Sequence, residues 1–178
     1  MLSGDQILSF FPKGTLNILR YVDLLTASGI EDVIFENGLV ILYPVKCNNS
    51  GHWCCLFKKG NTIYFFDSYG YIPDDQLNFS SRLQKNKQYL LDPEDFRHLT
   101  ELLYKFVSTR KGNRVDYNPY TFQGEKYPDG SYIETCGYHC IARLKLKNFD
   151  TDTYYDFMKN GKTFTSDDLV VELVKIVY

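Results

Sequence analysis

A pair of apolar runs joined by a short turn constrains the fold of this chain more than any other feature. The runs HWCCLF and TIYFFD are separated by KKGN, in which Gly and Asn tolerate a positive φ. This pattern predicts an antiparallel β-hairpin. Its first strand begins at His52 and its second ends at Asp67, so we expect both polar side chains at the same edge of a sheet.

The remaining elements are predicted from apolar patterns and turn signals. GLVILYPV, residues 38–45, predicts a buried strand, and RVDYN predicts another. The segment 15–28 is compatible with a helix, although its pattern is ambiguous. Other helices are predicted over SGDQILSFF, after Asp92 and Pro93, from Cys136, over DTDTYYDFMKNG as far as Gly161, and from Ser166 through Val177. Strands in the middle with helices at both ends predict one α+β domain, residues 1–178, with a central mixed sheet flanked by helices.

Composition excludes several classes of protein. The apolar fraction of 44% over 178 residues excludes general disorder and suits a single domain with a real core. With 20 Lys and Arg against 22 Asp and Glu, the chain has no overall charge that would draw it to nucleic acid or anionic lipid. No apolar run approaches about 18 residues and no leader is evident, so we expect a soluble protein without a membrane partner. The five cysteines, an odd number, favour free thiols in a reducing compartment.

Cys136 is the candidate nucleophile. It lies between Thr135 and Gly137 at an expected helix N-terminus, where unpaired N–H groups and the helix dipole stabilise a thiolate. A catalytic thiol also needs a basic partner, and His52 is the candidate. His52 needs an acceptor that fixes its tautomer, and Asp67 at the neighbouring strand end can supply one. The placement therefore predicts a Cys–His–Asp triad.

Gln123 completes the set of candidate catalytic residues. It lies in YNPYTFQGEKY, shortly before the cysteine, and its side-chain N–H could stabilise a developing oxyanion. Each of the four residues alone has an ordinary structural explanation. An isolated cysteine in an apolar segment, for example, is usually a packing residue. The hypothesis depends on the joint pattern of the four.

A zinc site is the competing interpretation of the cysteines. Its possible ligands are Cys54, Cys55, Cys136, His139 and Cys140. The chain has no CxxC pair, the adjacent Cys54 and Cys55 point to opposite faces of a strand, and His52 would be left unexplained. We therefore expect no metal and no cofactor, with His139 as a packing or hydrogen-bonded residue and the other three thiols as core.

The elements GHW, FFDSYG, YN…Q and TCGYHC, in the order His, Asp, Gln, Cys, resemble the adenain and SUMO-protease superfamily of cysteine peptidases. The maturation proteases of adenovirus-related viruses, virophages and allied mobile elements are the most similar in pattern. The resemblance covers about residues 38 to 145, and the N-terminal LSGDQILSFF resembles the family's opening helix more weakly. It implies a papain-like core of the adenain/SUMO-protease fold.

Carried over to this chain, the resemblance makes Cys136 the nucleophile and His52 the general base, then acid. Asp67 orients His52, and Gln123 joins the backbone N–H of Cys136 in the oxyanion hole. Trp53 walls a narrow channel that admits Gly beside the scissile bond. In one departure from the family pattern, GEKYPDGSYIE separates the glutamine from the cysteine, and we expect it to form a surface hairpin over the cleft.

The expected function is that of a thiol endopeptidase, which cleaves viral capsid or core precursors at Gly-containing sites in the virion and host cytoplasm. Relatives of adenain use DNA and a viral peptide as activators. For this chain, only the resemblance implies such activators. Two alternatives stay open. One is a deconjugating protease for ubiquitin-like modifiers, and the other is a catalytically inactive binding module on the same fold.

Overall fold

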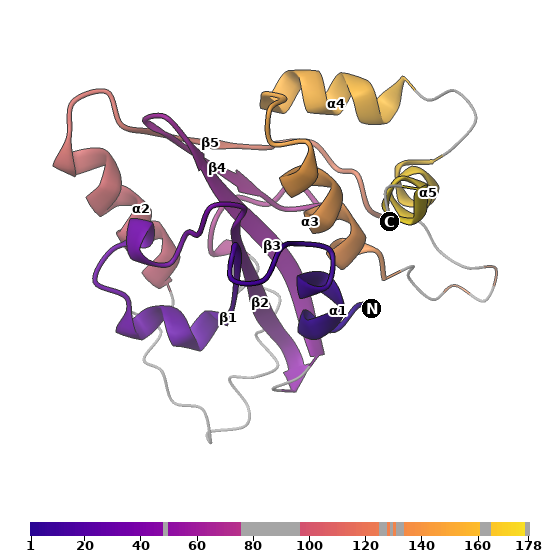
Figure 1. Ribbon diagram of the computed structural model, residues 1–178, viewed down its shortest axis with the longest axis horizontal. Helices are drawn as coiled ribbons and strands as arrows, with labels where there is room; N and C mark the ends of the chain where they lie inside the picture. The colour runs from indigo at the N-terminus through magenta and orange to yellow at the C-terminus, as the bar shows by residue number, and fades with distance from the viewer. Residues whose placement is uncertain are drawn as a thin grey trace.

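The computed structural model in Figure 1 combines one five-stranded sheet with helices on both faces. It describes residues 1–47, 50–75, 97–124, 128, 130, 134–160 and 165–176. The strands are β1 (Leu16–Arg20), β2 (Gly38–Cys47), β3 (Ser50–Lys59), β4 (Thr62–Phe66) and β5 (Arg114–Tyr117). The helices are α1 (Gly4–Leu8), α2 (His98–Thr109), α3 (Cys136–Lys145), α4 (Thr151–Lys159) and α5 (Ser166–Ile176), with short 3₁₀ turns η1 (Tyr21–Thr26) and η2 (Ile30–Asp32).

The sheet is mixed, as predicted for an α+β domain. The strand order follows the sequence, and β1 pairs with β2, and β4 with β5, in parallel. The two central pairings, β2 with β3 and β3 with β4, are antiparallel. The predicted hairpin is therefore confirmed, with Lys59 opposite Thr62 and Gly60 at a φ of 59° in the turn.

Alternation along the central strands divides the core between two faces. One face packs against α1, α3, α4 and α5, and the strands contribute Val40, Leu42, Trp53, Cys55 and Phe57 to it. The other face packs against η1, η2 and α2, and it receives Leu39, Ile41, Tyr43, Cys54 and Leu56. Cys54 and Cys55 thus point to opposite faces, as predicted.

Residues 15–28 do not form the helix that their ambiguous pattern allowed. The segment begins as β1, whose Leu16 lies opposite Gly38 and whose Arg20 lies opposite Leu42 in β2. The parallel ladder satisfies backbone groups that a helix would satisfy internally, so tertiary pairing outweighs local propensity. The chain then turns into η1, where the Asp23 carboxylate accepts a 3.1 Å hydrogen bond from the backbone N–H of Arg20.

The other predicted helices are confirmed where the structure describes them. Ser3 and Gln6 form the expected capping box at α1. The apolar faces of α2 and α5 are buried at the positions Leu99, Leu102, Leu103, Phe106, Val170 and Val174, whereas Val107 is exposed. The predicted capping pair Asp92 and Pro93, the helix stop at Gly161 and the residues Phe96 and Val177 lie outside the described residues, as does most of the predicted hairpin in 124–134. No helix in the described part of the chain is long and apolar enough to cross a membrane.

The unequal lengths of β3 and β4 create the place for a site. The last residue of β4, Phe66, pairs with Cys55, so the first half of β3 extends past the end of its partner. On its other side His52 still pairs with Tyr43 of β2. The N-terminal half of α3 packs against this part of β3, where the Cys140 thiol donates to the carbonyl of Trp53 at 3.4 Å.

Candidate active site

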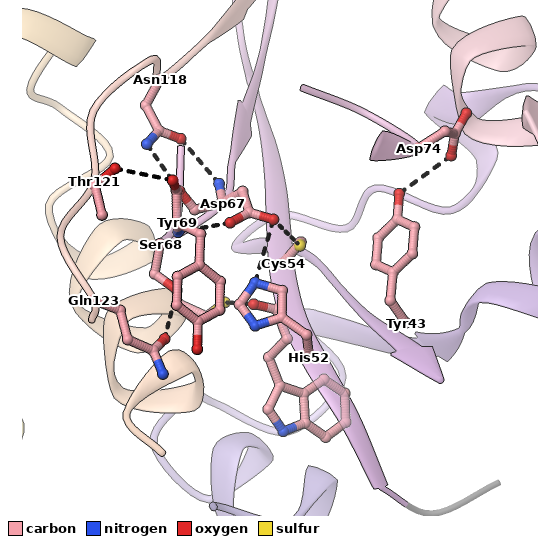
Figure 2. Close-up of polar contacts among 12 residues, drawn as sticks. Tyr43, His52, Cys54, Asp67, Ser68, Tyr69, Asp74, Asn118, Thr121 and Gln123 are labelled. Carbon is pink, nitrogen blue, oxygen red and sulfur yellow. Dashed lines mark hydrogen bonds and ion pairs between the residues drawn. The ribbon is translucent and has the colours of Figure 1, made fainter. Parts of the chain in front are cut away.

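His52 and Asp67 meet at the sheet edge where the hairpin pattern predicts them. Nε2 of His52 lies 3.2 Å from Oδ2 of Asp67, and Figure 2 shows this ion pair beside the end of β4. Both side chains are almost completely buried. The pairing leaves Nδ1 as the imidazole nitrogen that can serve another partner.

A tight turn after β4 holds the Asp67 carboxylate. Its Oδ1 accepts a 2.7 Å hydrogen bond from the backbone N–H of Tyr69, the pattern of an Asx-turn. Gly70 closes the turn at a φ of 79°, and a Cβ there would lie 2.9 Å from the carbonyl oxygen of Tyr120. The segment FFDSYG therefore needs both its aspartate and its glycine.

The side chain of Asn118 holds the backbone of Asp67. Its Oδ1 accepts from the N–H of Asp67 at 2.9 Å, and its Nδ2 donates to the Asp67 carbonyl at 2.8 Å. A second bond from Nδ2 reaches the Tyr120 carbonyl at 2.9 Å. This buried amide thus joins the end of β4 to the segment that leads to Gln123, as Figure 2 shows.

Cys136 is the first residue of α3, as predicted, and it interacts with His52. Burial alone lowers the pKa of His52, but hydrogen bonds to Asp67 and Cys136, together with their charges, outweigh burial and raise that pKa to about 9. The imidazole is therefore protonated at pH 7. A protonated imidazole can donate a hydrogen bond to Cys136 at the start of α3.

Gln123 lies close to the same turn and is buried. Its Oε1 accepts a 2.8 Å hydrogen bond from the Ser68 hydroxyl, and its backbone N–H donates to the Ser68 carbonyl at 3.0 Å. Because the oxygen end faces Ser68, the amide nitrogen points away from that residue, as Figure 2 shows. Gln123 also borders a pocket of about 370 Å³ between its own segment, the end of α4 and the start of α5.

Comparison with known proteins identifies a virophage relative. The chain is 32% identical over 176 residues to "Uncharacterized protein V9" of Sputnik virophage, and the alignment covers 95% of this chain and 91% of that protein. The chain belongs to this virophage protein family. No family model matches it. The predicted relationship to virophage proteins is thus confirmed, while the name of the relative states no activity.

In this virophage family member, Trp53 is a core residue by its contacts. Its indole N–H donates to the carbonyl of Leu2 at 3.0 Å, and 5% of the residue is exposed. Cys140 and Cys55 pack on the same side of the sheet, as expected for core thiols. The role of Trp53 as the wall of a substrate channel stays a prediction.

A second buried histidine, His139, lies one turn along α3 and pairs with a buried carboxylate from α5. Nε2 of His139 is 3.0 Å from Oδ1 of Asp167, at the start of α5, as expected for a hydrogen-bonded residue on this helix. The same carboxylate accepts hydrogen bonds from the Thr135 hydroxyl and, at 3.3 Å, from the backbone N–H of Gly124. Asp167 therefore ties together the residues next to Cys136 and Gln123.

Sequence reasoning missed several residues that support the site, among them Cys54, Ser68, Asn118 and Asp167. Ser68 and Asn118 stand within FFDSYG and YN, so their positions gave a signal. Asp167 gave none, because its helix is distant in sequence. Cys54 was assigned to packing, but its thiol donates to Oδ2 of Asp67 at 3.1 Å.

One group of possible metal ligands occurs among the described residues, namely His52, Cys54 and Asp67, whose ligand atoms lie within 4.8 Å of one another. It differs from the zinc set considered from sequence, because His139 pairs with Asp167 and Cys55 faces the carbonyl of Cys140. Protons on the thiol and imidazole account for the short contacts with the carboxylate.

Proposed function

We propose that this virophage family protein is a thiol endopeptidase with Cys136 as its nucleophile. The observation that carries the proposal is the position of His52, with Asp67 3.2 Å from one ring nitrogen and hydrogen bonds to Asp67 and Cys136 that raise the pKa of His52 to about 9. A buried histidine without such partners would have a lowered pKa. The order His, Asp, Gln, Cys and the mixed sheet flanked by helices are compatible with the adenain/SUMO-protease fold, which is part of the proposal.

The chemistry is a two-step acyl transfer. Sγ of Cys136 bonds to the scissile carbonyl carbon, and the proton held on His52 passes to the leaving nitrogen as the C–N bond breaks. Water then attacks the thioester carbon while His52 accepts its proton. The C–S bond breaks, the acid product leaves and the proton is shared again between His52 and Cys136. Asp67 stabilises the imidazolium throughout.

Stabilisation of the oxyanion is assigned to Gln123 and the backbone N–H of Cys136. The 2.8 Å bond from Ser68 to Oε1 supports this role because it selects the amide orientation in which nitrogen, the donor, is turned away from Ser68. Ser68 is then the residue that orients Gln123.

The proposed substrates are capsid or core precursor proteins with Gly at the cleavage site, processed in the virion and host cytoplasm. The virophage relative supports a viral context. The specificity follows from the resemblance, in which Trp53 excludes branched side chains.

An electrophilic probe that ends in Gly tests the activity. We expect one covalent adduct, on Cys136, identified by mass spectrometry of the intact protein and its peptides. Cys140→Ala is the matched control, because Cys140 is equally buried, lies one turn further along α3 and belongs to the core. Absence of an adduct at Cys136 would make the protein a binding module. Cleavage of ubiquitin-like fusions in preference to virophage capsid precursors would make it a deconjugating protease.

A further inference from the structure

One oxygen of Asp67 serves two partners. Oδ2 lies 3.1 Å from Sγ of Cys54 and 3.2 Å from Nε2 of His52, and Figure 2 shows both contacts at this atom. The other oxygen, Oδ1, accepts from the backbone N–H of Tyr69. The thiol and the imidazole therefore share the charge on the same carboxylate oxygen.

The strand geometry explains how Cys54 reaches Asp67. Residues 52 and 54 of β3 are two apart, so their side chains lie on the same face. β4 ends at Phe66, and the next residue, Asp67, turns its carboxylate towards that face. Cys55 points to the opposite face, where its thiol lies 3.9 Å from the carbonyl of Cys140. Burial raises the pKa of Cys54 well above its usual range, so the thiol keeps the proton that it donates.

We propose that Cys54 is a positioning residue whose thiol donates to Oδ2 of Asp67 and limits how strongly that oxygen attracts the proton on His52. The role rests on the proposed function, since it concerns the triad of the thiol protease. Its physical basis is simple: a donor that bonds to a carboxylate lowers the proton affinity of that carboxylate. Without the thiol, Oδ2 would stabilise the imidazolium more strongly.

His52 has other titratable neighbours, which stay constant in the test. They are Tyr43 on the paired strand β2, Asp67 and Tyr69 after β4, and Cys136 and His139 on α3. The ring of Tyr69 lies 4.9 Å from that of His52, centroid to centroid. A substitution confined to residue 54 therefore changes the pKa of His52 through the loss of the donor to Oδ2.

The test uses Cys54→Ala and Cys54→Val, with the pKa of the His52 ring measured by NMR titration of the full chain. Both substitutions remove the donor, but alanine is smaller than cysteine and valine is larger. We expect the pKa of His52 to rise in both, by about half a unit. Cys55→Ala is the matched control, because Cys55 is also fully buried but faces away from Asp67, and it should leave the pKa of His52 unchanged.

A pure packing role predicts a different result. If alanine and valine shift the pKa of His52 in opposite directions, or if neither shifts it, the positioning role is wrong. Melting temperatures of the three variants show how much each cavity or overfilled site lowers thermal stability, independently of the pKa of His52. In parallel, the reaction of Cys136 with the Gly-ending probe is measured on the protein without substitutions. A missing adduct contradicts the proposed function, whereas an unmoved pKa contradicts only the role of Cys54.

Discussion

The two buried histidine–carboxylate pairs of this protein are alike in geometry and opposite in electrostatics. His52 lies 3.2 Å from Asp67, and His139 lies 3.0 Å from Asp167. Burial is the largest influence on both histidines, and it lowers the pKa of each. Yet the pKa of His52 rises to about 9, while that of His139 stays below its usual value.

The difference lies in the second partner. His52 gains hydrogen bonds and charge from both Asp67 and Cys136, whereas Asp167 alone supports a charge on His139. The carboxylate of Asp167 is also shared with Thr135 and Gly124, and the charge on His52 disfavours a second imidazolium nearby. A buried His–Asp contact is thus no sign of catalysis by itself. Together with the contact to Asp67, the interaction with Cys136, which His139 lacks, is what raises the pKa of His52.

Cys136→Ala removes that second partner, and we expect it to have the largest effect on activity. Turnover of a Gly-containing substrate should fall by at least about 10⁴-fold, because no other group replaces the thiolate. The pKa of His52, measured by NMR, should fall below 9 towards the behaviour of His139. Cys140→Ala should keep most of the activity. Turnover retained by Cys136→Ala would contradict the assignment of the nucleophile.

Asp67→Asn and Asp167→Asn compare the two carboxylates directly. We expect Asp67→Asn to lower turnover by on the order of 10³-fold, because asparagine does not stabilise the imidazolium, while neutral iodoacetamide still alkylates Cys136. Asp167→Asn should instead lower the free energy of unfolding by about 2–3 kcal/mol, because it disturbs a buried network. Rates and urea unfolding curves distinguish the two. If both variants lose activity equally with unchanged stability, the division into a catalytic and a structural pair is wrong.

The positions of the candidate triad were predictable because they depend on local rules. The hairpin signal KKGN brought His52 and Asp67 to one edge, and the helix start at Cys136 followed from TCG. Partners from distant segments were not predictable in this way. Asp167 reaches His139 only because α5 packs beside α3, and β1 became a strand only because β2 was available to pair with it. Cys54 could have been suspected from its two-residue spacing to His52, since both share one strand face.

The two histidines should give the stability of the protein opposite dependences on pH. The folded state holds the proton on His52 up to about pH 9, while an unfolded histidine loses it near 6.5. The stabilising contribution of His52 is therefore complete below about pH 6.5 and is lost as the pH rises towards 9. The pKa of His139 is lowered, so the unfolded chain binds that proton more readily and stability falls as the pH drops below about 6.5.

Glutamine substitutions test these two slopes while they keep a side-chain donor. His52→Gln should flatten the loss of stability between about pH 7 and 9, and His139→Gln should flatten the loss between about pH 7 and 5. The change for His52 should amount to roughly 1 kcal/mol or more across its window, as one pKa unit corresponds to about 1.4 kcal/mol, and the change for His139 should have the opposite slope. Chemical unfolding at several pH values measures both. If His52→Gln instead changed the loss of stability between about pH 7 and 5, the assignment of opposite pH slopes to the two histidines would be wrong.

Trp53 connects the two pairs, and its substitution should have the smallest effect. It follows His52 in β3, its carbonyl accepts from Cys140 of the helix that carries His139, and its indole N–H donates to Leu2. Trp53→Phe keeps an aromatic ring but removes the indole donor, so we expect unfolding to become easier by about 1 kcal/mol. The pKa of His52 should stay near 9, because phenylalanine introduces no charge. If the ring also walls a substrate channel, the preference for Gly over Ala beside the cut should weaken in the same variant. A fallen melting temperature with an unchanged Gly-to-Ala ratio would limit Trp53 to the core, and the two measurements together decide between these roles.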